Sequence, residues 1–218
     1  MSENDRYIEP ARETEAELKE KRSLFIGRVI RAYDEIGAKD AVKEVSRKFP
    51  DATHNCWAYR VGFPQTVEYY SDAGEPSGTA GKPILGAILR SGLVNVVVVV
   101  TRYFGGTKLG VRGLIDAYGK SASMALEAAG KRNRVQSRLA FLRCPYEHAQ
   151  MVTRQLVDLG IPEEEISHDW GEMVGLRVSV PVSLAKDAES LFEGYGERGL
   201  ITNWKWQNRL EGSFDDVS

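Results

Sequence analysis

Five consecutive valines, Val96–Val100, place the strongest constraint on the fold of this 218-residue chain. Valine is β-branched and favours an extended backbone. Because side chains alternate between the two faces of a strand, this run is apolar on both faces. Such a strand is stable in the middle of a sheet that is covered on both sides. The run therefore predicts a central strand over residues 93–103, which Gly105 and Gly106 end.

The segments around this strand alternate between strand and helix patterns. Asp34 is expected to cap a helix that Pro50 ends. The first fifteen or so residues are polar and are expected to be disordered until they join a strand. Further strands are predicted at 25–32, 54–61 and 67–71, and further helices at 79–90 and 110–129.

The last part of the chain predicts a second domain. Residues 131–137 are polar and basic, and the boundary is placed there, giving domains 1–134 and 135–218. Residues 214–218 are expected to form a frayed tail. The predicted elements are a strand (139–145), a helix (147–159), two strands (166–170 and 175–181), a helix (184–195) and a strand (202–207). This βαββαβ order is that of a ferredoxin-like sandwich, so the fold class is α+β with two domains.

Charge is distributed unevenly along the chain. Residues 1–136 carry about 21 Lys+Arg against 17 Asp+Glu, and residues 137–218 about 8 against 14. This asymmetry suggests two domains with different tasks. No segment approaches the roughly 20 apolar residues of a membrane span, and the acidic N-terminus lacks the order of a secretory signal. Two cysteines are too few for a disulfide framework, so a cytoplasmic location without membrane contact is expected.

The first candidate binding loop covers residues 71–83 and leads into a predicted helix. Backbone N–H groups at a helix N-terminus attract anions, and Lys82 adds a full charge. The loop is not a nucleotide-binding P-loop, because Pro76 replaces its first glycine and a proline follows the lysine. A capped structural turn is the alternative, with Ser77 or Thr79 as the cap. The candidate anion-binding residues are Ser77, Gly78, Thr79, Gly81 and Lys82.

The second candidate loop covers residues 102–113, at the carboxyl end of the valine strand, where open α/β sheets bind ligands. Its cations are interleaved with aromatic residues, a combination that suits phosphate contact and base stacking. The alternative is that an aromatic ring fills the core while the cations are solvated. Binding is favoured for the loop as a unit. The candidate residues are Arg102, Tyr103, Phe104, Gly105, Gly106, Lys108 and Arg112.

Catalytic and metal-binding patterns are weak. His54 and Cys56 share one face of a strand, but two ligands do not make a zinc site, so no metal or other cofactor is expected. Asp72 and Glu75 are either paired functional carboxylates or solvated and capping groups. His54 is interpreted as a structural or ligand-contacting residue.

Three segments together resemble the YigZ/IMPACT family. They are HNCWA at residues 54–58, SDAGEPSGTAGKP at 71–83 and VTRYFGGTKLG at 100–110. The resemblance implies a first domain similar to the second domain of a small-subunit ribosomal protein, with a mixed sheet and helices on one side, followed by a ferredoxin-like domain. Leu24 departs from the family pattern, which usually has a basic residue there, and Arg112 makes the second loop more cationic.

The family resemblance also implies a role in translation, without an assigned catalytic reaction. Three functions stay open. The leading hypothesis is a regulatory protein that binds RNA or the ribosome through the two loops. The second is an enzyme for a small phosphorylated or nucleotide substrate, with His54, Asp72 or Glu75 as acid/base groups. The third is a protein-interaction regulator whose C-terminal domain offers Trp204 and Trp206 to a partner, with core packing of both rings as the alternative.

Overall fold

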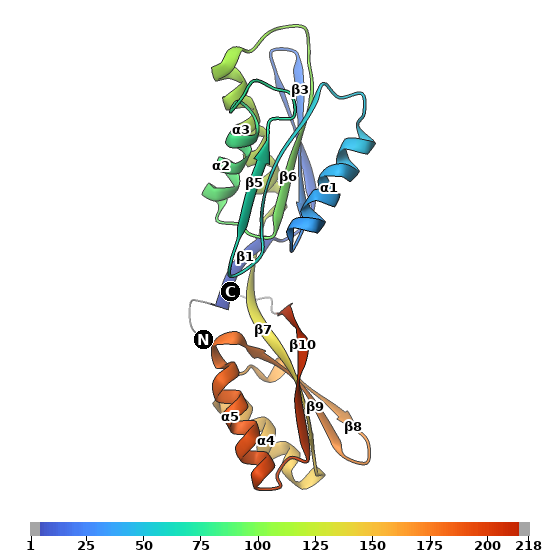
Figure 1. Cartoon of the computed structure of the whole chain (residues 1–218), viewed down its shortest axis with the longest axis vertical. Helices are drawn as coiled ribbons and strands as arrows, with labels where there is room; N and C mark the ends of the chain where they lie inside the picture. Colours follow the sequence, from blue (N-terminus) through green and yellow to red (C-terminus); the bar gives the residue numbers. More distant parts are fainter. Residues whose placement is uncertain (1–4, 214–218) are drawn as a thin grey trace. The chain divides into compact units, whose positions relative to one another are not determined.

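The computed structural model describes residues 5–213, with side chains as far as Gln207. The chain divides into two compact units. One is Tyr7–Asn133, called here the first unit, and the other, the second unit, combines the described residues of Met1–Arg6 and Arg134–Ser218. Two five-stranded sheets and the helices packed on them confirm the predicted α+β fold (Figure 1).

The first sheet has the strand order β2-β3-β6-β4-β5. Its strands are β2 (Thr14–Glu20), β3 (Ser23–Arg31), β4 (His54–Val61), β5 (Val67–Ser71) and β6 (Val96–Tyr103). All neighbouring strands are antiparallel. The five valines of β6 are fully buried in the centre, which confirms the prediction drawn from them.

Helices cover both faces of this sheet. They are α1 (Glu35–Lys48), α2 (Gly81–Ser91) and α3 (Gly110–Ala129). Val98 belongs to the core beneath α2 and α3, whereas Val97 and Val99 belong to the core beneath α1. The expected mixed sheet with helices on one side is therefore wrong. Alternate valines point to opposite faces, so each face needs its own apolar cover.

From Arg6 onward, the first fifteen residues do not form the expected disordered segment. They form β1 (Arg6–Pro10) and the edge strand β2. Tyr7 is 8% exposed, and its ring lies 4.7 Å from that of Phe63. Polar residues alternate along β2 because one of its faces is solvated. The segment is therefore polar overall, and its composition alone does not indicate a strand.

The second unit has the βαββαβ order that the sequence predicts. Its elements are β7 (Lys131–Cys144), α4 (Tyr146–Asp158), β8 (Ile166–Trp170), β9 (Val174–Pro181), α5 (Ala185–Glu197) and β10 (Asn203–Ser213). The strand order β10-β7-β9-β8 is ferredoxin-like, and β1 also joins β7. Residues 131–137, expected as a boundary segment, are the first half of β7. The predicted tail, residues 214–218, lies outside the described residues.

Trp204 and Trp206 pack inward. Both are half-buried, and their rings lie 5.3 and 5.9 Å from the ring of buried Phe192. Core packing is therefore their role in the fold, and neither ring is presented to a partner as an exposed anchor. Within residues 5–213, no helix is both long and apolar enough to span a membrane.

Candidate functional site: a buried polar cluster and an exposed cationic rim

The first candidate loop is folded around the carboxylate of Asp72. One oxygen accepts the N–H of Gly78 at 2.8 Å, and the other accepts those of Ala80 and Gly81 at 2.9 and 2.8 Å. Burial opposes ionisation, but the three N–H groups outweigh it and lower the pKa of Asp72. The N-terminus of α2 is therefore already occupied by a negative charge from the protein itself.

The predicted caps of α2 are wrong. Ser77 is exposed, and the hydroxyl of Thr79 donates to the carbonyl of Pro76 at 2.7 Å instead of capping the helix. No side-chain cap is present at Ala80, the residue that precedes the helix. Asp72 instead accepts the free N–H groups at the start of α2. It can do so because the backbone turns sharply at Gly78, where φ is +76°, and this turn brings the N–H groups of the following residues back to the carboxylate.

Glu75 and Arg102 form a buried ion pair between the first loop and β6. Their side chains are 4% and 7% exposed. The same Glu75 oxygen that contacts Arg102 also accepts the hydroxyl of Tyr118 on α3 at 2.8 Å. The Arg102 guanidinium lies 5.4 Å from the ring centres of Phe25 and Phe104. Its charge is thus neutralised inside the unit, and only the Nε atom is buried without a hydrogen-bond partner among the described residues.

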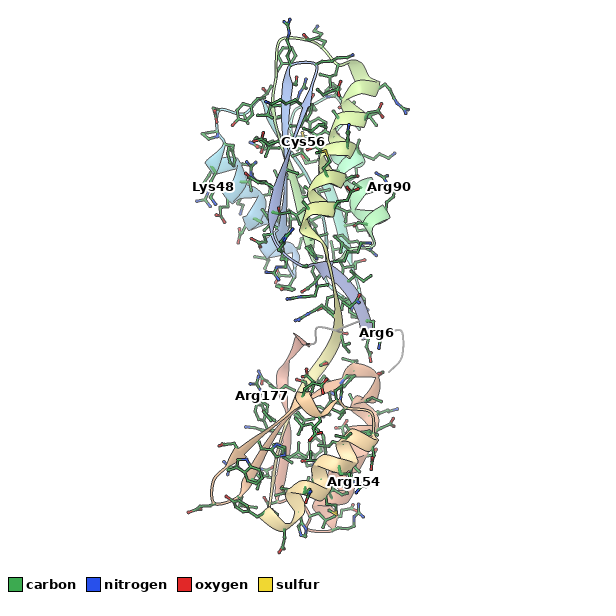
Figure 2. All side chains as sticks on the ribbon, turned by 180° about the vertical axis from the view of Figure 1, so that it is seen from behind. Arg6, Lys48, Cys56, Arg90, Arg154 and Arg177 are labelled. Carbon is green, nitrogen blue, oxygen red and sulfur yellow. The ribbon has the colours of Figure 1, made fainter. Side chains whose placement is uncertain are left out.

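Cys56 lies at the centre of this cluster, between the sheet and α3 (Figure 2). Its thiol donates to the carbonyl of Asp72 at 2.9 Å and lies 3.4 Å from the Tyr118 hydroxyl. Burial raises the pKa of Cys56 to about 12. Burial, reinforced by Cys56 and Glu75, also raises the pKa of Tyr118. Both groups are therefore protonated at neutral pH, and Cys56 is a poor nucleophile in the folded chain.

His54, like Asp72, is a partly exposed member of the cluster, and its side chain is 23% exposed. Its Nδ1 lies 2.9 Å from the carbonyl oxygen of Ala73, and its Nε2 lies 4.0 Å from the carboxylate of Glu75. A side chain at Gly74 would come within 3.2 Å of the imidazole ring. His54 thus holds the first loop against β4.

The second loop packs against the turn between β2 and β3. The N–H groups of Phe104 and Gly105 donate to the hydroxyls of Thr53 and Ser23 at 2.9 and 3.2 Å. A Cβ atom at Gly105 would lie 1.9 Å from the carbonyl oxygen of Arg22, so only glycine allows this approach. The turn and the loop therefore form one continuous surface.

The turn itself consists of Lys21 and Arg22, both exposed and both with positive φ, at 44° and 69°. A two-residue hairpin with positive φ at both positions normally carries Asn-Gly. A hollow of about 300 Å³ is lined by Lys21, Leu109 and Lys120, together with the carboxylates of Glu20 and Asp116.

The remaining predicted residues lie at the surface of the first unit. Lys82, Gly106 and Lys108 are exposed, and Phe104 is 45% exposed. Arg112, 87% exposed, pairs with Asp116 at 3.1 Å. Tyr103 is half-buried, and its hydroxyl donates to Asp51 at 3.3 Å.

The structure therefore separates the predicted site residues into two groups. His54, Asp72, Glu75 and Arg102 join the buried cluster, whereas Phe104 and Lys108 stay accessible. Sequence reasoning missed Tyr118, and it missed the Lys21–Arg22 turn. A two-residue connection between alternating segments was the signal for that turn, although its residues are not typical turn formers. Within the described part of the chain, no three His, Cys, Asp or Glu side chains are grouped to hold a metal ion.

Comparisons with known proteins agree with this architecture. Residues 21–126 match the Impact N-terminal domain. The chain is 38% identical to IMPACT family member YvyE of Bacillus subtilis (strain 168) over 65% of each chain. It is 35% identical to IMPACT family member YigZ of Escherichia coli (strain K12) over 78% of this chain and 82% of the relative. A crystal structure of a hypothetical protein matches with a TM-score of 0.64 and 28% identity, covering 98% of this chain and 99% of that one.

The fold and the cluster thus define a two-unit α+β protein with an Impact-type first unit. The chain belongs to the IMPACT family.

Proposed function

We propose that this protein binds RNA, free or within the ribosome, as a translation-associated regulatory protein of the cytoplasm. The binding surface in this proposal is the cationic rim, defined as Lys21, Arg22 and Lys108. All three side chains are exposed, and the approach of Gly105 to Arg22 joins the turn and the loop that carry them. Cations arranged in this way suit successive phosphates of a nucleic-acid backbone.

The observation that carries the proposal is the conformation of the Lys21–Arg22 turn. Both residues adopt a left-handed backbone that costs a residue with a side chain about 1–2 kcal/mol. Asparagine and glycine would remove that cost. A hairpin with two cations at its tip is therefore less stable than one with Asn-Gly, but it carries two more positive charges at the surface. Residues with a strained backbone are found preferentially at functional sites.

Phe104 gives the rim an aromatic element. It is 45% exposed, and its ring lies above the guanidinium of Arg102, whose position is fixed by Glu75. A base can stack on an exposed ring that is held in place from below. The buried cluster thus acts as a support for the surface, not as the contact itself.

The alternative of an enzyme draws less support from the geometry. Asp72 is engaged by three backbone N–H groups, and Glu75 is 4% exposed and paired. Neither carboxylate is positioned to exchange a proton with a bound substrate. Of the three acid/base candidates, His54 and Asp72 are partly exposed and Glu75 is buried.

The test measures binding of the full chain to ribosomal particles and to a labelled RNA across a range of salt concentrations. In the variant Lys21→Gln/Arg22→Gln/Lys108→Gln, we expect affinity to fall by about tenfold or more and the salt dependence to become shallower. The matched control is Lys39→Gln/Lys43→Gln/Lys48→Gln, which removes three exposed lysines from α1. Equal binding by the two variants would overturn the rim as the RNA-binding surface. Lys108 is changed without Arg102, because loss of Arg102 would leave Glu75 buried without its cation.

A further inference from the structure

Strand β8 forms one edge of the sheet in the second unit (Figure 1). Among the described strands it pairs with β9 alone, from Ile166 opposite Val178 to Trp170 opposite Val174. A strand with one neighbour leaves the N–H and C=O groups of alternate residues pointing outward without a strand partner. An extended segment of another protein can occupy such an edge as an added strand.

An exposed tryptophan is held in a fixed position at the end of this strand. Trp170 is 62% exposed. Its ring stacks on that of His168, with the ring centres 5.5 Å apart, and lies 5.7 Å from the ring of Tyr146 on α4. His168 Nε2 in turn lies 2.9 Å from the hydroxyl oxygen of Thr153, and the Tyr146 hydroxyl donates to the carbonyl of Gly171. A large ring that is exposed but already ordered loses little freedom on binding, and such rings are frequent binding hot spots.

The charge around β8 is almost entirely negative. Residues 155–176 contain no Lys or Arg, and their six acidic residues are Asp158, Glu163, Glu164, Glu165, Asp169 and Glu172. Glu163, Glu164, Asp169 and Glu172 are exposed, and among the described residues no cation lies at ion-pair distance from any of them. The one cation in register with β8 is Arg177, opposite Ser167, and it is already engaged within the chain. We call β8 together with Glu163, Glu164 and Glu172 the acidic edge.

This charge determines which strand the edge can accept. A nucleic acid would bring phosphates beside the exposed carboxylates and would be repelled. A second copy of this chain, pairing edge to edge, would bring its own acids close to those of the first copy, and like charges that face each other across a strand pair destabilise it. Natural sheets use charge at an edge in this way to prevent self-association. A cationic strand meets neither obstacle.

We propose that the acidic edge binds an extended, lysine- or arginine-rich segment of a partner protein as an added strand of the sheet. The backbone of that segment completes the outward hydrogen bonds of β8, and its alternate side chains point to the two faces of the sheet. On one face a cation lies over the ring of Trp170, and on the other a cation pairs with Asp169. Glu163, Glu164 and Glu172 extend the negative charge beyond the two ends of the strand. This site is independent of RNA binding at the cationic rim, which belongs to the first unit.

The experiment adds the full chain to a labelled peptide of about nine alternating arginine and valine residues and follows fluorescence anisotropy across salt concentrations. One control peptide is N-methylated throughout, so it keeps every charge but lacks the N–H donors, and a second replaces arginine by glutamate. The variants of the chain are Trp170→Ala and Asp169→Asn/Glu172→Gln. The matched control is Glu193→Gln/Glu197→Gln, which removes two exposed carboxylates from α5 of the same unit. Circular dichroism verifies that every variant is folded.

We expect Trp170→Ala to weaken binding of the basic peptide about tenfold and Asp169→Asn/Glu172→Gln to weaken it about threefold, with a shallower salt dependence for the double variant alone. The helix control should bind the peptide as the wild type does. Both control peptides should bind at least about tenfold more weakly than the basic peptide. Equal binding of the N-methylated peptide would overturn strand addition, and equal binding by Trp170→Ala and the helix control would overturn the aromatic anchor.

Two further measurements test the other occupants of the edge. Analytical ultracentrifugation gives the oligomeric state, and a dimer that Trp170→Ala dissociates would overturn the proposal, because a second copy would then cover the edge. Binding of the labelled RNA that tests the cationic rim should be unchanged in both edge variants. A loss of RNA binding in Trp170→Ala would place a nucleic acid on the edge and would overturn a protein strand as its occupant.

Discussion

Glu75 and Arg102 form an ion pair that is almost completely shielded from water, with side chains 4% and 7% exposed. The pair joins the first glycine-rich loop to the central strand β6, and Tyr118 adds a contact from α3. A buried charge that loses its partner is strongly destabilising, so these residues hold two loops and a helix in one arrangement. The motifs that mark the family in the sequence meet at this pair.

Breaking this pair should cost more than breaking any exposed one. Glu75→Gln leaves the Arg102 charge buried and unpaired, and we expect the free energy of unfolding to fall by about 3–5 kcal/mol. Urea unfolding, with hydrogen exchange at the β6 amides to isolate the first unit, measures the loss. Glu44→Gln, at an exposed pair on α1, is the control and should change little. An equal effect of both variants would remove the argument for the pair as a support.

Replacing both members of the pair by apolar residues distinguishes the cost of an unpaired buried charge from the cost of the other lost contacts. Glu75→Leu/Arg102→Met removes both charges at once, and we expect it to recover part of the stability lost in Glu75→Gln. A double variant less stable than the single one would show that the hydrogen bond to Tyr118, not the unpaired charge, dominates the loss.

The contribution of Asp72 should depend on pH. Its folded-state pKa is lowered, so its ionised form stabilises the fold above the ordinary pKa of 3.8, and this stability is lost as the pH falls through the lowered value. In Asp72→Asn one acceptor oxygen is replaced by an NH₂ group near the backbone donors. The stability difference between wild type and variant should therefore be largest at neutral pH and shrink below about pH 4. Unfolding measured at neutral and acid pH tests this, and a difference that grows in acid would contradict it.

Replacing the two residues of the turn between β2 and β3 should make the fold more stable and RNA binding weaker. Lys21→Asn/Arg22→Gly supplies the residues that a left-handed turn favours, and we expect the free energy of unfolding to rise by about 1 kcal/mol while RNA binding weakens. Lys21→Gln/Arg22→Gln is the control, since it removes both charges and keeps the strain. It should weaken binding equally without the gain in stability. Unchanged RNA binding in both variants would separate the strain from any role in recognition.

Two adjacent glycines should differ in their response to alanine. Gly105→Ala places a methyl group 1.9 Å from the Arg22 carbonyl oxygen, so the hairpin and the loop must move apart. A Cβ at Gly106 meets nothing within 4 Å, and only its φ of +85° opposes the change, at about 1–2 kcal/mol. We expect Gly105→Ala to be the more destabilising and to weaken RNA binding as well. Comparable melting temperatures for the two variants would contradict the close approach.

The two cysteines should resist alkylation in the folded chain. Both are buried, and burial raises the pKa of Cys56 to about 12 and also raises that of Cys144. At pH 8 the thiolate is therefore rare, and iodoacetamide should label either thiol only after unfolding in urea. Mass spectrometry of the labelled chain reads out each site. Rapid labelling of Cys56 without denaturant would contradict this prediction and would show that its thiol is reactive in the folded chain.

Much of the fold follows from local sequence pattern. The valine run specifies a strand buried on both faces, and Asp34 caps α1 through the N–H of Gly37 as its position predicts. The βαββαβ order of the second unit also follows from hydrophobic periodicity. Local sequence pattern does not predict strand β2, because an edge strand with one solvated face has too few apolar residues to be recognised.

The candidate site is different, because its members lie far apart in the chain. The sequence determined that two glycine-rich loops carry cations and carboxylates, but it did not determine which group each charged side chain contacts. Tertiary structure decided that Arg102 pairs with Glu75, that Asp72 caps α2, and that the exposed cations Lys21 and Arg22 lie beside Gly105. The reason is physical: local pattern reports which face of an element is apolar, whereas the partner of a charge depends on which elements pack together, and those contacts span tens of residues.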